Sequence, residues 1–399
     1  MSKVKPIYGV GLDAGSRRTR IVICALEGPR LRFLASGAAP SEGWQKGRIA
    51  DQGAVAGSMR AALRQAEAAA SVSVEGAVVG VGGPVVSGAN GHGLVELGHV
   101  RAIEQRDVNR VVERAARVIL PADRMILQMC PRDFVVDNHP GHRDPRRMLA
   151  SRLELHVHLV TASAQEHTTL VGAVNQAHLL VEETVFEALA AAYASVLPED
   201  RRQGVAVVDI GSESTEIAVY HGEAMYLAST TKVSGDHFTR DLAHALCVSF
   251  EDAERLKLEF GGAVCDACPD NVWIELPPCD HRERGAQRKF VNYVLEERAA
   301  QLFRLVQAEL RRIGMDGDIM GGVFLAGAGA RLEDLCDVAE RELRCHARYG
   351  LPIGILDWPE SLDNPEWTTA AGLAMYSAKL KAQTRRQQAA AGWLGRILK

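Results

Sequence analysis

The chain has 399 residues, of which 47% are hydrophobic and 24% are charged, as expected for a soluble protein with two well-packed domains. The net charge of −4 argues against nucleic acid as the main partner, and no apolar run is long enough to span a membrane. The first residues lead into a strand and lack the apolar core of a secretory signal. Eight cysteines without a framework spacing indicate a reducing cytoplasm.

The first elements form a strand–turn–strand unit that recurs later in the chain. Residues 7–38 alternate apolar and polar positions around turn signals, which predicts a meander of short strands. Within them, residues 9–25 read GVGLDAGSRRTRIVICA, and residues 204–220 read GVAVVDIGSESTEIAVY. Aligned without a gap, the two segments share five residues in nine positions, so we infer one structural unit used twice, in two related domains. The shared pairs are Asp13 and Asp209, Gly15 and Gly211, Ser16 and Ser212, Thr19 and Thr215, and Ile21 and Ile217.

The first domain is predicted to contain an insertion. Residues 51–70 have the apolar spacing of a helix, and a buried strand that leads into a Gly/Pro loop follows them. Between about 85 and 165 the composition changes to a charged helix and short strands, which we interpret as a small α+β interaction subdomain. A strand and a helix at 179–197 close the domain. We therefore assign 1–84 plus 166–203 to a first lobe.

The second domain begins at the repeated unit. We assign 204–232 plus 315–377 to a second α/β lobe. Residues 233–314, which include a long predicted helix at 290–314, form its small subdomain. A buried strand leads into a third Gly-rich turn, LAGAGARL, at 325–332.

The repeated turns have the chemistry of phosphate sites. Glycine permits a tight turn, in which successive backbone N–H groups form a concave anion site. An Asp at each strand end, Asp13 and Asp209, would hold Mg²⁺ through the water shell that this ion keeps. One such turn is more simply an ordinary hairpin. Two copies and a third Gly-rich turn favour a nucleotide cleft between the lobes.

The last residues differ from the rest in charge. Residues 379–399 contain six basic residues and no acidic residue. We predict a linker at 378–388 and an amphipathic helix at 389–399 that lies in the plane of a membrane surface; a helix docked on the protein's own core is the alternative. The apolar face consists of Trp393, Leu394, Ile397 and Leu398, and the basic residues Arg396 and Lys399 lie on the other face.

Several stretches resemble the FtsA family of bacterial division proteins, within the actin-like superfamily. They are RLELHVHLVTASAQEHTTLV at 152–171, LPADRMILQMCPRDFVVD at 120–137, SGDHFTRDLAHAL at 234–246 and FEDAERLKLEFGGA at 250–263. The resemblance extends over almost the whole chain and includes the insertion, which is peculiar to that family and its relatives. It implies a two-lobed actin-like (ribonuclease-H-like) ATPase fold with an inserted α+β subdomain, and ATP and Mg²⁺ as cofactors.

The same resemblance implies roles for individual residues. Asp13 and Asp209 would lie near Mg²⁺, and Glu187, at the start of a predicted helix, would orient the attacking water. Without the resemblance, Glu187 is an acid favoured by the helix dipole, and Glu254 with Lys257 is an exposed ion pair one turn apart. The predicted nucleotide-binding residues are Gly15, Ser16, Arg18, Gly211, Ser212 and Gly235 around the phosphates, Glu254 and Lys257 at the ribose and base, and Gly327 and Gly329 at the adenine.

The chain departs from the family pattern in the turns themselves. Glu213 stands in the second phosphate loop, where the family usually has glycine, and Ala326 and Ala328 stand where glycine is common in the adenine loop. A carboxylate at 213 would approach a phosphate of its own sign unless it turns away. We therefore expect weak nucleotide binding and at most slow hydrolysis, with ATP serving to close the cleft and favour assembly.

Two further predictions concern the small subdomain. In FtsA proteins this region binds the C-terminal peptide of the ring protein FtsZ, which implies Arg288 and Arg298 as contacts here; a solvated charged face is the alternative. Cys265, Cys268, Cys279 and His281 are zinc-ligand types, but their spacing is unusual, so we prefer reduced structural cysteines.

These features predict a membrane-tethered, actin-like scaffold of bacterial cell division. It would bind ATP, polymerise, contact anionic lipids and anchor the FtsZ ring to the inner face of the cytoplasmic membrane at the division site. Later division proteins would bind residues 85–165. The alternative is an actin-like scaffold of pilus assembly that binds the cytoplasmic peptide of a membrane protein, against which the amphipathic helix argues. A small-molecule kinase would need a base and a substrate pocket, and a chaperone would need a further peptide-binding domain.

Overall fold

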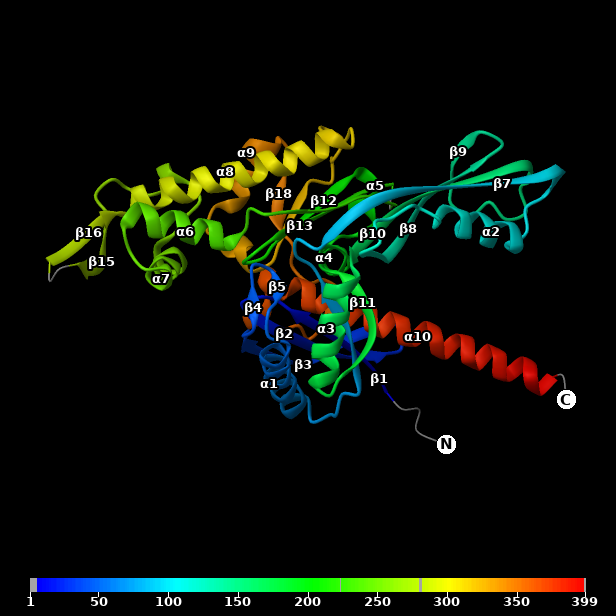
Figure 1. Cartoon of the computed structure of the whole chain (residues 1–399), viewed down its shortest axis with the longest axis horizontal. Coiled ribbons are helices and arrows are strands. Elements are labelled where there is room, and N and C mark those ends of the chain that lie inside the picture. Colours follow the sequence, from blue (N-terminus) through cyan, green and yellow to red (C-terminus); the bar gives the residue numbers. More distant parts are fainter. Residues whose placement is uncertain (1–5, 223, 280–281, 398–399) are drawn as a thin grey trace.

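The computed structural model describes residues 6–222, 224–279 and 282–397, and the side chains of the last helix are described as far as residue 385. Two lobes, each built on a mixed sheet, form the body of the molecule, and two smaller subdomains extend from it in opposite directions (Figure 1). The actin-like α/β architecture expected from the resemblance is confirmed.

The first lobe is built on a six-stranded sheet in the order β11-β6-β1-β2-β3-β19. Strands β1, β2 and β3 form the predicted antiparallel meander, and β6 joins β1 in parallel. Gly9 and Gly11 allow helix α10 (Thr368–Ile397) to lie directly on β1, because a Cβ at either glycine would come 2.3 Å from a carbonyl oxygen of that helix. The strands are β1 (Ile7–Ala14), β2 (Arg18–Glu27), β3 (Arg30–Pro40), β6 (Gly76–Val81), β11 (Leu180–Phe186) and β19 (Ile355–Leu356), with a small hairpin of β4 (Trp44–Gln45) and β5 (Arg48–Ile49). The helices are α1 (Gln52–Ala70), α3 (Ala164–Gln176), α4 (Glu187–Ser195) and α5 (Pro198–Gln203).

The second lobe repeats this plan. Its sheet has the order β14-β13-β12-β17-β18, in which an antiparallel meander is again extended by a parallel strand. The two hairpins share one register, since Asp13 pairs with Arg20 in the first and Asp209 with Glu216 in the second. The elements are β12 (Val205–Ile210), β13 (Thr215–His221), β14 (Ala224–Thr231), β17 (Val323–Ala326), β18 (Ala347–Tyr349), α9 (Leu335–Leu343) and the short 3-10 turns η2 (Ala328–Arg331), η3 (Glu360–Leu362) and η4 (Pro365–Trp367).

The insertion in the first lobe is a four-stranded sheet, β7-β10-β8-β9, with one helix on its face. Its apolar core includes Val95, Val111 and Leu155, all fully buried. The inserted subdomain also contacts the second lobe, because the ring of His158 accepts a hydrogen bond of 2.9 Å from the backbone N–H of Ala228. Its elements are β7 (Val86–Ala102), α2 (Gln105–Ala115), β8 (Arg124–Val136), β9 (His139–His142) and β10 (Leu149–Ser163).

The small subdomain of the second lobe is mainly helical and ends in a two-stranded hairpin on the far side of the body from the insertion (Figure 1). Its long helix packs through Leu295, Phe303 and Val306, which are fully buried. The elements are α6 (Gly235–Leu246), α7 (Phe250–Phe260), the 3-10 turn η1 (Cys265–Ala267), β15 (Trp273–Cys279), β16 (Arg282–Gln287) and α8 (Arg288–Arg312).

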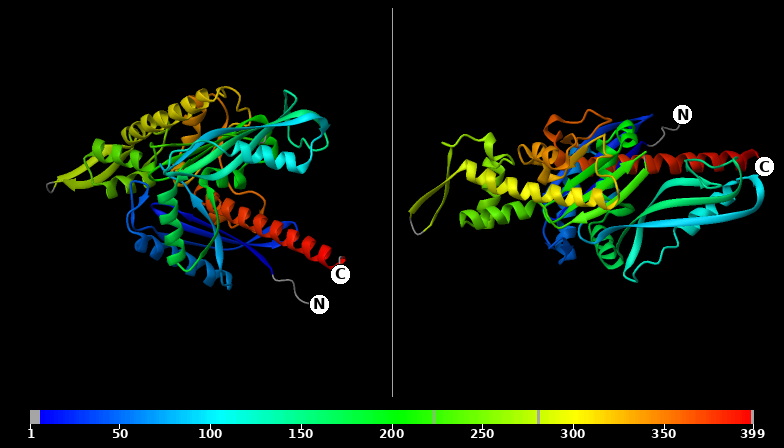
Figure 2. Two further views of the ribbon diagram at one scale, coloured as in Figure 1. Left: turned by 45° about the vertical axis from the view of Figure 1, so that its right-hand side comes forward. Right: turned by 90° about the horizontal axis from the view of Figure 1, so that it is seen from above.

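The last helix, α10 (Thr368–Ile397), corrects one expectation. It starts in the core of the first lobe and continues without a break through 378–388, where we expected a linker. That segment is polar, but Lys, Ala, Gln and Arg are strong helix formers, and neither Pro nor Gly interrupts it. The far end of α10 projects from the body on the same side as the inserted subdomain (Figures 1 and 2).

The side chains of the predicted membrane-binding face, Trp393, Leu394, Arg396 and Ile397, and the residues Leu398 and Lys399, lie outside the described part of the chain. Among the described residues, no helix combines the length and apolar character needed to cross a bilayer.

Candidate functional site

A cleft of about 450 Å³ lies between the two lobes, and the turns of both repeated hairpins line it. The third Gly-rich turn and helices α6 and α7 complete its walls. Every residue that the sequence predicts for nucleotide, magnesium or water binding is on this lining: Asp13, Gly15, Ser16, Arg18, Glu187, Asp209, Gly211, Ser212, Gly235, Glu254, Lys257, Gly327 and Gly329.

The two hairpin turns touch one another across the cleft. The Ser16 and Ser212 hydroxyl oxygens are 2.7 Å apart and share a hydrogen bond. Each turn requires its glycine in the same way, because a Cβ at Gly15 would lie 2.8 Å from the Arg18 carbonyl oxygen and one at Gly211 would lie 2.9 Å from that of Ser214. The repeat is therefore one of local geometry as well as of sequence.

Among the carboxyl groups that line the cleft, those of Asp13, Glu187, Asp209 and Glu216 interact with one another. Burial raises the pKa of Asp13 to about 7, with the charge of Asp209 adding to this effect and that of Arg20 opposing it. Burial, with the charge of Asp209, likewise raises the pKa of Glu216 to about 7. Burial also raises the pKa of Glu187 well above its ordinary value, and the charges of Asp13 and Glu216 contribute. So many buried carboxyl oxygens suit a hard divalent cation such as Mg²⁺, which would stabilise their charged forms.

Buried partners hold the two aspartates in place. The Arg20 guanidinium lies 3.9 Å from Asp13 and forms an ion pair of 2.5 Å with Glu366. The Thr369 hydroxyl, in the first turn of α10, donates a hydrogen bond of 2.5 Å to Asp209. Arg20, Glu366 and Thr369 are not among the site residues predicted from the sequence.

Glu216 is also a residue that the sequence analysis missed. It accepts hydrogen bonds of 2.7 Å from the backbone N–H of Gly83 and from the Ser214 hydroxyl. A signal for Arg20 and Glu216 was present, since they hold the same position in the two copies of the repeat, directly across the hairpin from Asp13 and Asp209.

Glu213, which lines the cleft, also joins the two lobes. Its carboxylate accepts a hydrogen bond of 2.7 Å from the backbone N–H of Gly47, in the first lobe. Arg17 of the first hairpin makes the reciprocal contact, an ion pair of 3.1 Å with Asp236 in the second lobe's small subdomain.

Glu254 and Lys257 form an ion pair of 2.8 Å at the end of the cleft near α6. The ammonium group of Lys257 also donates to the Thr239 hydroxyl at 2.8 Å and to the Gly235 carbonyl at 3.3 Å. Burial raises the pKa of Glu254, but the charge and hydrogen bond of Lys257 outweigh it and leave the pKa below its ordinary value. The pair is therefore tied to the wall of the cleft rather than free in solvent.

The third turn lies against the second hairpin. Gly327 has φ of +82°, and a Cβ there would lie 2.3 Å from an Asp209 carboxylate oxygen. A Cβ at Gly329 would lie 2.4 Å from the side chain of Ile210. Any larger residue at either position would disturb the strand end that carries Asp209. The alanines Ala326 and Ala328, by contrast, are accommodated beside them.

The predicted peptide contacts, Arg288 and Arg298, both have partners within the chain, those of Arg298 in the small subdomain and those of Arg288 in the small subdomain and the second lobe. Arg288 donates to the Phe260 carbonyl at 2.7 Å and pairs with Glu333 at 3.1 Å. Arg298 forms a two-point ion pair with Asp241, with distances of 2.5 and 2.8 Å.

The cysteines predicted as a possible zinc site are described only in part. Cys265 and Cys268 are free thiols, and each is directed at a backbone carbonyl, those of Lys289 and Pro269. The Cys279 side chain and His281 lie outside the described residues, so this prediction remains open.

Comparison with known proteins identifies the chain's family. Residues 206–372 match the model of the family described as cell division protein FtsA, and residues 83–161 match that of the SHS2 domain inserted in FtsA. The FtsA of Pseudomonas aeruginosa is 32% identical over 370 residues, which cover 92% of this chain and 88% of that protein. The chain belongs to the FtsA family. The FtsA of Escherichia coli is 29% identical over 97% of this chain and 96% of its own length.

The protein is thus an actin-like cell division protein, and the inserted subdomain is the SHS2 domain typical of FtsA. The solved structures that resemble this chain have low sequence identity to it, so they support only the fold. A PilM–PilN complex of type IV pilus biogenesis has a TM-score of 0.66 at 16% identity, covering 93% of this chain and 98% of that one. MreB5 of Spiroplasma citri bound to ADP has a TM-score of 0.58 at 14% identity, covering 95% and 98% of the two chains.

Proposed function

We propose that this FtsA-family protein binds Mg–ATP between its lobes, polymerises, and anchors the FtsZ ring to the inner face of the cytoplasmic membrane at the division site. One observation carries the proposal. Three Gly-rich turns and the carboxyl groups of Asp13 and Asp209 all line the same cleft. The pilus protein shares the fold at only 16% sequence identity, which shows a common fold and not a common function. The structural likeness therefore does not favour the pilus alternative.

In the proposed complex the phosphates lie against the two hairpin turns, whose backbone N–H groups and serine hydroxyls are donors. Ser16 and Ser212 separate to admit the terminal phosphate, because their hydroxyls now contact each other. Asp13 and Asp209 hold Mg²⁺ through water, and the ion compensates their burial. Glu254 and Lys257 are placed at the ribose and base end.

We infer that hydrolysis is slow. Glu187 is the candidate for orienting the attacking water. The second phosphate loop, however, carries Glu213 where the family usually has glycine. Nucleotide then acts mainly by joining the lobes, which already contact each other through Glu213, Glu216 and Arg17.

Membrane attachment is assigned to the far end of α10. Trp393, Leu394, Ile397 and Leu398 provide the apolar face, and Arg396 and Lys399 the charges for anionic lipids. One such helix binds reversibly, so a polymer that presents many of them gains attachment through effective concentration.

Co-sedimentation with vesicles that contain anionic lipid tests this assignment. We expect the full chain to pellet with vesicles and a chain ending at Gln388 to stay in the supernatant. Leu394→Glu should reduce pelleting strongly, whereas the matched control Gln387→Glu, which adds the same charge before the predicted helix, should not. Equal pelleting of the full and shortened chains would overturn the membrane assignment.

FtsZ binding is assigned to the small subdomain. Leu258, Trp273, Phe290 and Tyr293 expose large apolar surfaces there, and Arg288 lies close to them in sequence. Fluorescence anisotropy with the host's FtsZ C-terminal peptide should show saturable binding. Arg288→Ala should weaken it, and Arg304→Ala, an exposed ion-paired arginine on the same helix, should not. Absence of binding would argue against the anchoring role and leave the membrane result intact.

Binding of later division proteins is assigned to the SHS2 domain.

A further inference from the structure

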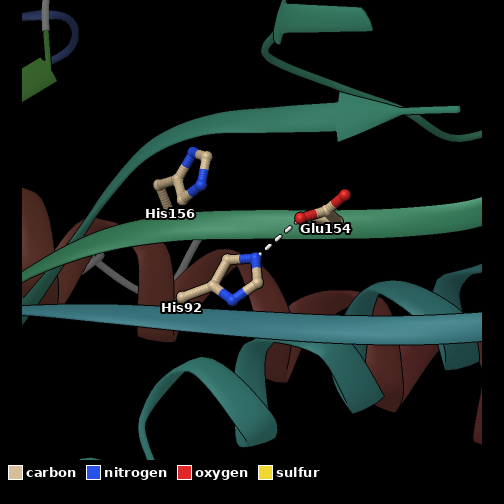
Figure 3. Close-up of side chains that lie close together, drawn as sticks. All are labelled: His92, Glu154 and His156. Atoms are coloured by element: carbon tan, nitrogen blue, oxygen red, sulfur yellow. Dashed lines mark hydrogen bonds and ion pairs between the residues drawn. The ribbon is translucent and has the colours of Figure 1, made fainter. Parts of the chain in front are cut away.

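His92, Glu154 and His156 form a cluster on the inserted subdomain, away from the cleft (Figure 3). His92 and His156 are directly opposite each other on the paired strands β7 and β10. Glu154 is two residues before His156, so its side chain lies on the same face of the sheet. The neighbours of His92, Gly91 and Gly93, face α2, because a Cβ on either would meet that helix. The cluster is therefore on the open face of the sheet, opposite α2.

The three side chains converge closely enough to share one ion. One ligand atom from each lies within 4.8 Å of the others. His92 Nε2 and Glu154 Oε2 are 2.7 Å apart, and the two imidazole rings stack with centroids 5.1 Å apart. Two imidazoles and one carboxylate are a common ligand set for zinc, and three protein ligands leave a coordination position open.

We propose that His92, Glu154 and His156 bind a divalent transition-metal ion, with Zn²⁺ the best match. The metal takes the place of the proton between His92 and Glu154, and that proton moves to the other ring nitrogen of His92. The open position is filled by water or by a side chain of another molecule.

The surroundings support this assignment and define its limits. His156 Nδ1 lies 3.2 Å from the Asp133 carboxylate, the arrangement in which a carboxylate orients a metal-binding imidazole and leaves its Nε2 for the metal. Arg152 pairs with the other oxygen of Glu154 at 2.8 Å, so one oxygen remains for the ion. The exposed fractions of the His92 and His156 side chains, 48% and 43%, leave an entry path from solvent.

Calorimetric titration of the untagged full chain with Zn²⁺ tests the proposal. Excess Mg²⁺ in the buffer occupies the acidic cleft, and Cys265→Ser in the background removes a thiolate from the second candidate zinc site. We expect one ion per chain. His92→Ala, His156→Ala and Glu154→Gln should each weaken binding by at least about tenfold, and Asp133→Asn by roughly tenfold. His99→Ala, an exposed histidine farther along β7, is the matched control and should leave binding unchanged.

Co²⁺ provides an independent measurement. A site of nitrogen and oxygen ligands gives only weak visible bands, whereas thiolate ligands add a strong near-ultraviolet charge-transfer band. Weak bands that vanish in Glu154→Gln support the proposal. The proposal is overturned by the absence of stoichiometric binding, by equal weakening in His99→Ala, or by a thiolate band that persists in His92→Ala.

Discussion

The two hairpins that face each other across the cleft have the same backbone and opposite charges. The first copy carries Arg17, Arg18 and Arg20, and the second carries Glu213, Ser214 and Glu216 at the same positions. The aspartates and glycines, which shape the turns, are unchanged. This difference indicates that the two copies keep the turn geometry of the proposed phosphate site while their differing positions join the lobes, through Arg17 in one direction and through Glu213 and Glu216 in the other.

The largest contrast is expected at the paired positions 20 and 216. Arg20→Met removes a buried cation from Asp13 and Glu366 and leaves Glu366 with its weaker, more exposed partner Arg331, so the free energy of unfolding should fall by about 3–5 kcal/mol. Glu216→Gln removes one of several crowded acids and keeps an acceptor for Gly83, so it should not lower the free energy of unfolding. Urea unfolding of both variants without nucleotide measures the contrast. Equal losses would show that the charge difference between the copies is not structural.

The aspartates, by contrast, should behave alike. Asp13→Asn and Asp209→Asn each remove a carboxylate from the proposed magnesium site, and each should weaken Mg–ATP binding by roughly 10- to 100-fold, or about 1.4–2.7 kcal/mol. Titration with a fluorescent ATP analogue checks both. The control is Asp236→Asn, an acid of the same cleft whose partner is Arg17. If only one of the two variants binds ATP more weakly, Asp13 and Asp209 do not have equivalent roles in the site.

The buried acids predict an unusual pH dependence without nucleotide. Asp13 and Glu216 have folded pKa values of about 7, above their ordinary values of 3.8 and 4.5, so the folded state binds more protons than the unfolded state between those limits. Their contribution to stability therefore falls as pH rises from about 4 to 7 and stays lost above 7.

Histidine provides an opposing trend. Burial lowers the pKa of His158 to about 4, so its contribution is lost as pH falls below its ordinary value of 6.5. Because the two trends oppose each other, the effect of Glu216 is tested by comparing two proteins. The melting temperatures of the wild type and of Glu216→Gln are measured from pH 5 to 8, and the difference between them is followed. That difference should shrink when Mg²⁺ is added. A difference independent of pH would contradict the raised pKa of Glu216.

The smallest effect is expected at Glu213. Glu213→Ala removes the hydrogen bond to Gly47 and should cost about 1 kcal/mol of stability, whereas Glu213→Gln keeps an acceptor and should cost less. Because the carboxylate is held by the backbone N–H of Gly47, neither variant should raise ATP affinity by more than about threefold, or about 0.7 kcal/mol. A larger gain in either variant, measured by the same ATP-analogue titration, would restore the conflict of charges expected from the sequence.

Much of this architecture could be predicted from the sequence because short stretches of neighbouring residues determine it. The Asp-x-Gly-Ser repeat predicted both hairpins, and the change of composition predicted the insertion. The Arg20–Glu366 and Thr369–Asp209 contacts could not be predicted, since they join residues far apart in sequence that only the folded sheets bring together. The direction of Glu213 depends likewise on a backbone N–H of the other lobe.

The continuity of α10 was missed for a different reason. A polar segment without acids was interpreted as a linker, although its Lys, Ala, Gln and Arg residues favour helix. Composition describes how a segment interacts with water, whereas helix propensity describes its backbone. For residues 378–388 the two criteria disagreed, and the backbone preference decided the structure.

Helix α10 thus connects the cleft with a point outside the body of the molecule. Its buried first turn holds Asp209 through Thr369, and its 30 residues extend over about 45 Å. Because α10 is held against the first lobe as far as Lys381, its direction follows the orientation of that lobe. A rotation of the first lobe by about 5° about the inner end of α10 would displace the outer end by about 4 Å.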